Sequence, residues 1–157
     1  MRSKKITFNN YEIDAIVRNL DDPNSILATD DPERRLPINV LWVMETNLDK
    51  MRTIAQKILR EREKIEASFS DDEHSEIYEA DGQSGRKVKD KYITEFQKLL
   101  SELMEIQNEI EIGLVDVATL ERFSMTPRDF RSIKFMLTDS EEPKEEVENV
   151  NEIAEVV

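Results

Sequence analysis

Residues 37–69 read PINVLWVMETNLDKMRTIAQKILREREKIEASF, and this stretch decides the expected fold. Apolar side chains recur in it every three or four residues, as they do along one face of an α-helix. The series consists of Leu41, Met44, Leu48, Met51, Ala55, Ile58, Ile65 and Phe69. Arg62 interrupts it, but no Gly or Pro does, and Pro37 suits the first turn of a helix. The pattern predicts one helix about 50 Å long.

A second helix is expected after a polar connection. Residues 70–88 contain Asp81-Gly82 and Ser84-Gly85, which indicate a turn region or a small hairpin that pairs Ile77-Tyr78 with Lys87-Val88. The same apolar spacing then returns in Tyr92, Phe96, Leu99, Leu103, Ile106 and Ile110. Two matched seams predict a mainly α fold built on a long antiparallel two-helix hairpin with coiled-coil-like packing. Phe69 would lie near Tyr92, and Leu41 near Ile110.

The segments on either side of this hairpin predict a small β element and short helices. Residues 6–8 and residues 110–117 alternate like strands, with a bulge or bend at Gly113, and we expect them to pair as a short two-stranded sheet at the hairpin base. Short helices are expected over residues 10–20 and 126–137. Residues 1–137 would form a single helical-hairpin domain, and residues 138–157 an acidic, flexible tail.

Charge and composition exclude several classes of protein. The net charge is −13, and residues 138–157 hold eight acids and one lysine, so the rest of the chain is only moderately acidic. Direct nucleic-acid binding is disfavoured, because phosphates require a basic patch. The chain has no cysteine, and no apolar segment follows the basic residues 2–5 as a signal peptide would require. With no run long enough to span a bilayer, a cytoplasmic protein without membrane contact is expected.

The sequence predicts no enzyme, no metal and no cofactor. The single histidine, His74, lies among Asp71, Asp72, Glu73, Glu76 and Glu79, which suggests a carboxylate–histidine metal site. A solvated loop explains the same composition better, because an acidic run lacks the ligand spacing and the ordered surroundings of a metal centre. Nucleophile elbows and phosphate-binding loops are missing from the sequence as well.

Apolar residues beside the expected seam are the candidates for binding a partner. Trp42 could anchor an interface, although it could also close the base of the hairpin. Ile54, Leu59 and Leu100 occupy the outer faces of the two helices. Val147 and Val150 lie on one helical face of the tail, which would either fold on a partner or stay disordered as a solubilising end.

Four short motifs make the chain resemble a family of small phage and prophage proteins of unknown function. They are Lys5-Ile6-Thr7-Phe8-Asn9-Asn10, then Leu36-Pro37-Ile38, then residues 99–121 with Glu109-Ile110-Glu111-Ile112, and finally Met125-Thr126-Pro127 leading to Met136-Leu137. The resemblance spans residues 5–137 and implies a phage-related origin inside a bacterial host cell. It implies no activity.

Two functions follow from these features of the sequence. The first is a non-enzymatic protein–protein interaction module, acting as an adaptor, an assembly factor or an inhibitor of a host protein, with acidic mimicry of nucleic acid as one form of inhibition. The second is a self-associating structural or scaffolding component. Leftover apolar positions on the helices favour a homodimer, whereas the net negative charge opposes one.

Overall fold

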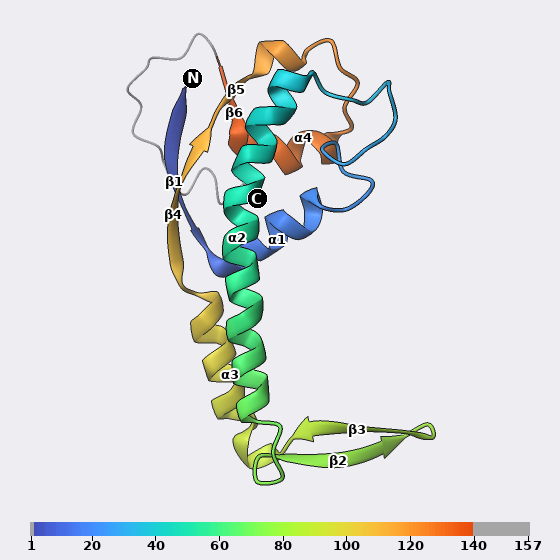
Figure 1. Cartoon of the computed structure of the whole chain (residues 1–157), viewed down its shortest axis with the longest axis vertical. Helices are drawn as coiled ribbons and strands as arrows, with labels where there is room; N and C mark the ends of the chain where they lie inside the picture. Colours follow the sequence, from blue (N-terminus) through green and yellow to red (C-terminus); the bar gives the residue numbers. More distant parts are fainter. Residues whose placement is uncertain (1, 140–157) are drawn as a thin grey trace.

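One long helix, α2, runs through most of the described part of the molecule, and the other elements lie along it except for β2 and β3, which extend from its lower end (Figure 1). The computed structural model describes residues 2–139. Their elements are β1 (Ser3–Asn9), α1 (Asn10–Leu20), α2 (Ile38–Ser68), β2 (Ser75–Ala80), β3 (Gln83–Val88), α3 (Asp90–Met104), β4 (Gln107–Gly113), β5 (Val115–Asp116), the 3-10 turn η1 (Val117–Leu120), α4 (Pro127–Ile133), the 3-10 turn η2 (Lys134–Met136) and β6 (Leu137–Thr138). The predicted tail lies outside these residues except for its first two positions.

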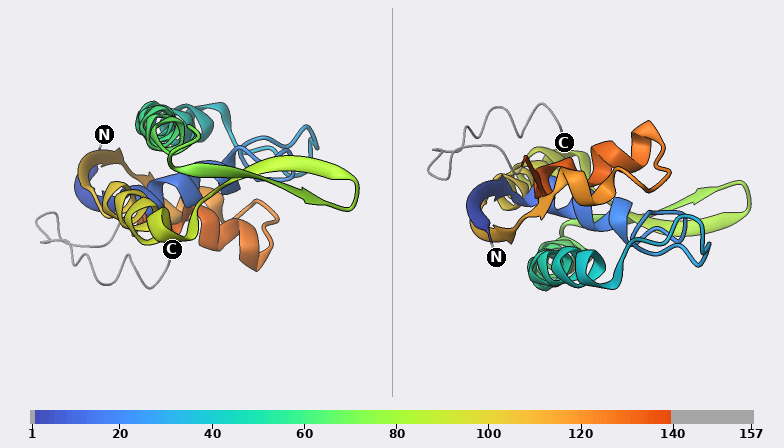
Figure 2. Two further views of the ribbon diagram at one scale, coloured as in Figure 1. Left: turned by 90° about the horizontal axis from the view of Figure 1, so that it is seen from below. Right: turned by 90° about the horizontal axis from the view of Figure 1, so that it is seen from above.

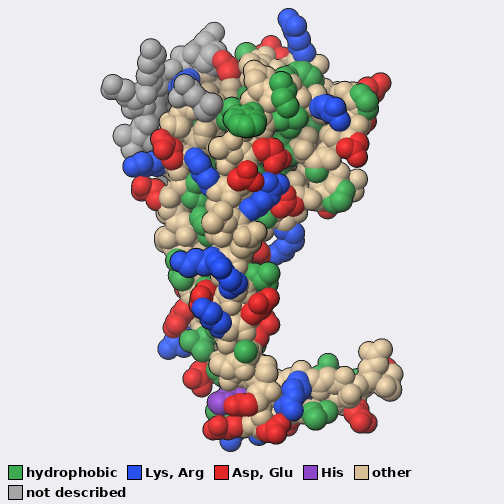
Figure 3. All heavy atoms as spheres, in the orientation of Figure 1, with side chains coloured by type: hydrophobic (Ala, Val, Ile, Leu, Met, Phe, Trp, Pro, Cys, Tyr) green, Lys and Arg blue, Asp and Glu red, His purple; other side chains and the backbone are tan. Residues whose placement is uncertain are grey.

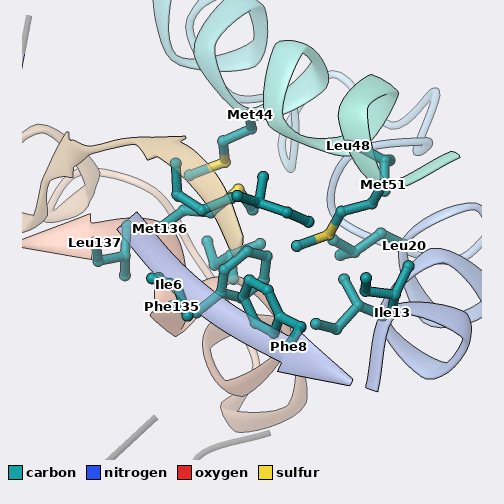
Figure 4. Packing of buried hydrophobic residues seen from close by; sticks show 14 of the residues in the cluster. Ile6, Phe8, Ile13, Leu20, Met44, Leu48, Met51, Phe135, Met136 and Leu137 are labelled. Atoms are coloured by element: carbon teal, nitrogen blue, oxygen red, sulfur yellow. The ribbon is translucent and has the colours of Figure 1, made fainter. Parts of the chain in front are cut away.

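The first half of α2 belongs to a head that also contains α1, α4 and the paired strands β1 and β4 (Figures 1 and 2). The strands run antiparallel, with Ile6 opposite Ile110, so the predicted pairing of these segments is confirmed. Their inner faces carry the buried Ile6, Phe8, Ile110 and Ile112. Phe8 meets Phe135 edge to ring at 5.8 Å between centroids, and Met44, Leu48 and Met51 close the core from α2 (Figure 4).

Two capping boxes set the starts of the short helices. Asn9 accepts a hydrogen bond from the Glu12 N–H, and the Glu12 side chain accepts one from the Asn9 N–H, so Asn9 caps α1. Thr126 and Asp129 form the same arrangement in front of α4, with Pro127 in its first turn. Asn10 is instead buried and donates to the carbonyl of Leu103 at 2.7 Å.

The prediction of a long two-helix hairpin is wrong. The second helix ends at Met104, and residues that were expected to continue its seam form strand β4. Leu41 therefore faces no helical Ile110, because Ile110 is paired with Ile6 in the ladder. The first half of α2 packs on α1 and β4, and α3 accompanies only its second half (Figure 1).

The error has a simple cause in the sequence. Ile106 and Ile110 fit a helical spacing of four, but Ile110 and Ile112 also fit the spacing of two that a strand requires. The buried pair Ile110 and Ile112 settles the segment as strand, and Ile106 is left 51% exposed. The small β element was also underestimated, since the described residues contain three two-stranded sheets.

The second half of α2 and α3 form a thin stalk below the head. From Leu59 to Ser68 no residue of α2 is buried, and Tyr92, Phe96 and Leu99 of α3 are half-buried. Arg62, which interrupts the apolar series, directs its guanidinium to the sulfur of Met104 at 3.4 Å. Within residues 2–139 no helix combines the length and the apolar character needed to cross a bilayer.

Candidate interaction surface

A β-hairpin projects sideways from the lower end of the stalk, away from the core (Figures 1 and 3). We call residues 75–88, which contain β2 and β3, the arm. Ser75 is the only buried residue of its two strands, and Gly85 and Val88 are half-buried. Ile77 is 67% exposed and Tyr78 is 44% exposed, although both are large and apolar in character. The arm therefore offers side chains and backbone to whatever approaches the end of the stalk.

The tip of the arm is a tight two-residue turn. Asp81 and Gly82 both have positive φ values, 53° and 77°, between the paired Ala80 and Gln83. This is the geometry of a type I′ turn, which Asp-Gly favours because its twist matches that of the strands. Along the strands Tyr78 lies opposite Gly85, and its ring covers that glycine, since a Cβ built there would meet the Tyr78 hydroxyl at 2.9 Å. The hairpin that the sequence offered as one option for residues 70–88 is thus present, but the predicted register is wrong. Ile77 pairs with Arg86 and Tyr78 with Gly85, whereas Lys87 and Val88 pair with Glu76 and Ser75.

Hydrogen bonds from Arg86 and Ser75 fasten the arm at its base. The N–H and the hydroxyl of Ser75 both donate to the carbonyl of Asp71, at 2.9 and 2.7 Å. Arg86 donates to the Ser75 hydroxyl at 2.9 Å and to the Asp72 carboxylate at 2.9 Å. These bonds lie at the stalk end of the arm, so the tip is held only by contacts between its own strands.

An aromatic joint connects the arm to the stalk. Phe69 at the end of α2 lies 5.2 Å from Phe96 and 5.4 Å from His74, and His74 lies 4.6 Å from Tyr92, between ring centroids. Phe69 and Tyr92, which were expected to be neighbours in the helical hairpin, each contact the ring of His74. Packed rings in this number stiffen the junction from which the arm extends.

Of the residues considered for a metal site at His74, only Asp71 and Glu73 lie in a small cluster with it. Ligand atoms of Asp71, Glu73 and His74 lie within 4.8 Å of one another, whereas Glu76 and Glu79 are on the arm and outside this group. The Nδ1 of His74 is 2.6 Å from the Asp71 carboxylate, and this hydrogen bond lowers the pKa of Asp71. Hydrogen bonding to Asp71 and packing against Phe69 and Tyr92 account for the position of the histidine.

The partner-binding residues expected from the sequence do not form one surface. Trp42 is 73% exposed and Leu59 is 52% exposed, but they are separated by about 25 Å along α2. Ile54 packs partly against the core, and Leu100 is half-buried on α3. The alternative role of Trp42, closing the base, is wrong, because its side chain faces solvent next to Ile38 on the first turns of α2. Val147 and Val150 lie outside the described residues.

A polar pocket of about 220 Å³ lies between the end of α1 and α4. It is lined by Asn19, Asp22, Asn24, Ser25, Arg128, Asp129, Arg131 and Ser132. Its buried carboxylate, Asp129, accepts hydrogen bonds from Arg34 at 3.0 and 3.1 Å and caps α4. Asp129 is thus committed to structure, and the pocket mixes both charges without a catalytic arrangement.

Ile77, Tyr78 and Arg86 were missed as binding candidates. The alternating Ser-Glu-Ile-Tyr-Glu-Ala before Asp81-Gly82 indicates a strand and a hairpin turn, but it says nothing of how far the hairpin stands from the core.

Searches with protein-family models, among curated proteins and among solved structures find nothing that matches this chain.

Proposed function

We propose that this chain is a non-enzymatic protein–protein interaction module whose contact element is the arm. The observation that carries the proposal is the exposure of the arm, where Ile77 and Tyr78 lie in solvent on a two-stranded sheet. An isolated two-stranded hairpin is marginally stable in water, and its outer edges present unpaired backbone groups. Adding a strand at such an edge is a common mode of protein recognition.

The shape of the molecule supports this role. The stalk holds the arm away from the head, so a bound protein can reach the hairpin without meeting the core (Figure 3). The anchors at Ser75 and Arg86 and the aromatic joint preorganise the arm, which reduces the entropy lost on binding. An adaptor, an assembly factor or an inhibitor would each use such an element.

The proposal also covers the origin and the cellular location of the protein. The resemblance to small phage and prophage proteins favours a phage-encoded module that acts on a protein of a bacterial host, in the cytoplasm. The arm itself carries acids and bases together, with Lys87 3.6 Å from Glu76. This mixture favours strand pairing over mimicry of a nucleic acid as the way in which the arm binds.

A site-specific cross-linking experiment in the producing cell tests the proposal. A photoreactive amino acid at Ile77 is expected to give defined protein adducts, and the same group at Lys98 of α3, an equally exposed control, is expected to give none. A third position, Trp42, tests the surface that the sequence favoured. Adducts that form equally at Lys98, or at Trp42 alone, would contradict a role for the arm.

A further inference from the structure

The outer edge of β2 carries residues whose backbone groups point away from β3. In an antiparallel pair, opposite residues alternate between bonded and non-bonded pairs. The tight turn makes Ala80 and Gln83 a bonded pair, and the Lys89 N–H donates to the His74 carbonyl at 2.8 Å at the other end. The alternation between these two points turns the backbone of Ile77 and Glu79 outward.

These outward groups have no backbone partner among the described residues. Ser75 also points outward, but its N–H is already bonded to the Asp71 carbonyl at 2.9 Å. The open part of the β2 edge is therefore short and centred on Tyr78, which lies between Ile77 and Glu79. Figure 1 shows β3 on the side of the arm that faces the head and β2 on the side that faces away. A strand can thus approach β2 without meeting the head.

We propose that β2 pairs antiparallel with β2 of a second copy of the chain, about a two-fold axis beside Tyr78. The inference rests on the proposed function, because it names a second copy of the chain as a partner at the β2 edge of the same arm. Ile77 of each copy exchanges both backbone hydrogen bonds with Glu79 of the other, and Tyr78 lies opposite Tyr78. The two heads then extend in opposite directions from a joint four-stranded sheet.

The residues of β2 suit pairing with themselves in this register. Glu76 lies opposite Ala80, Ile77 opposite Glu79, and Tyr78 opposite itself, so no two like charges face each other. A parallel, in-register arrangement would set Glu76 against Glu76 and Glu79 against Glu79, which is destabilising. The antiparallel pairing also covers Ile77, the most exposed apolar side chain of the arm.

The pairing closes after two copies. A two-fold contact uses the same edge of both chains and leaves no second copy of that edge. The remaining edge is that of β3, which faces the head and carries Arg86, already bonded to Ser75 and Asp72. The arrangement therefore predicts a dimer and no fibre.

Cysteine substitution tests the register directly, because the natural chain has no cysteine. Opposite residues in a non-bonded antiparallel pair have Cα atoms about 4.5 Å apart, within reach of a disulfide. Tyr78→Cys is therefore expected to give a disulfide-linked dimer under mild oxidation. Ser84→Cys, on the outer edge of β3, is the matched control, since three strand spacings of about 14 Å would separate its two copies.

Sedimentation equilibrium of the unmodified chain is the second measurement. Its mass is expected to rise with concentration from 18.4 kDa toward twice that value. Ile77→Glu places a carboxylate opposite Glu79 and should weaken association at least tenfold, and adding Glu79→Lys to the same chain should restore it. Ser84→Glu should leave it unchanged.

The outcomes separate this inference from the proposed function. A monomer mass at all concentrations, or equal disulfide formation by Ser84→Cys and Tyr78→Cys, overturns self-pairing. If the photoreactive group at Ile77 then captures a different protein, the proposed function stands and the second copy is not the partner. If it captures nothing, both fail.

Discussion

The side-chain amide of Asn47 forms two hydrogen bonds with the backbone of Gly113. Its Nδ2 donates to the Gly113 carbonyl at 2.8 Å, and its Oδ1 accepts from the Gly113 N–H at 2.8 Å. Asn47 is buried in the first half of α2, and Gly113 is where β4 ends before β5 begins. These two hydrogen bonds join α2 to the end of β4 within the head.

Replacement of Asn47 by Ala should destabilise the protein by about 1–3 kcal/mol, because both backbone groups of Gly113 lose their buried partner. Urea unfolding measures this change. Asn39→Ala, at an exposed position of the same helix, is the control and should stay within about 0.5 kcal/mol of the natural chain. Equal effects of the two substitutions would mean that the bonds to Gly113 contribute nothing.

The contact between Asn47 and Gly113 shows what a local pattern can predict and what it cannot. The interruption at Gly113 follows from alternation on both sides of a glycine. The apolar period of α2 likewise predicts its length, since nothing in the stretch competes with a helix. No local pattern predicts the role of Asn47. A polar residue beside the apolar series gives the same sequence pattern whether its side chain contacts solvent or a backbone segment far along the chain.

Both the fold and the candidate site depend on contacts that no local pattern shows. Ile110 fits a helical spacing with Ile106 and a strand spacing with Ile112, and only its pairing with Ile6 of β1 decides between them. The arm was visible in the sequence as a turn, but its projection depends on where α2 ends relative to the head. Trp42 was correctly noticed as a large side chain beside the seam, yet no local pattern distinguishes one exposed apolar residue from another such as Ile77.

Shortening an apolar side chain to Ala should destabilise the protein more in the core than in the stalk. Leu48 is buried against the head, whereas Leu59, about three turns later in the same helix, is 52% exposed. Leu48→Ala is expected to cost about 2–5 kcal/mol in unfolding free energy. Leu59→Ala should change it by no more than about 0.5 kcal/mol. Comparable losses would show that the stalk is packed as tightly as the head.

The carboxyl group of Asp71 should titrate below its ordinary pKa of 3.8, because it accepts hydrogen bonds from the side chain and the backbone N–H of His74. Replacing His74 by Phe keeps a ring in the aromatic joint and removes only the side-chain bond. The pKa of Asp71 should then rise toward 3.8 without reaching it, as followed by NMR of the carboxyl carbon. An unchanged pKa of Asp71 in His74→Phe would show that the imidazole does not cause the lowered pKa.

The lowered pKa of Asp71 also determines whether its contribution to stability rises or falls with pH. A carboxyl whose pKa is lowered in the folded state contributes stability above its ordinary pKa and loses it as the pH falls through the folded value. The contribution that Asp71 gains from His74 is therefore complete at neutral pH and disappears only in acid. A contribution that stays unchanged as the pH falls well below 3.8 would contradict the assignment.

Arg86 should control the order of the arm without affecting the head. Arg86→Met keeps a long aliphatic stem and removes the bonds to Ser75 and Asp72. Hydrogen exchange is expected to accelerate at the amides of Tyr78 and Gly85, which face each other across the hairpin, while the amide of Leu48 in the core stays protected. Unchanged exchange at Tyr78 would mean that the strand pairing alone holds the arm.

Self-association through the arm should become tighter as salt is added. Each chain carries a net charge of −13, and Glu76, Glu79 and Asp81 bring acids of both copies close together in the paired sheet. Salt shortens the screening length from about 30 Å at 0.01 M to about 3 Å at 1 M, which weakens this repulsion while leaving backbone hydrogen bonds and the burial of Ile77 largely unaffected. Sedimentation equilibrium at 0.05 M and 0.5 M NaCl should therefore give a smaller dissociation constant at the higher concentration. An interface held by ion pairs between basic and acidic residues would respond in the opposite direction. A larger dissociation constant at 0.5 M would consequently exclude the pairing of β2 with itself as the main contact.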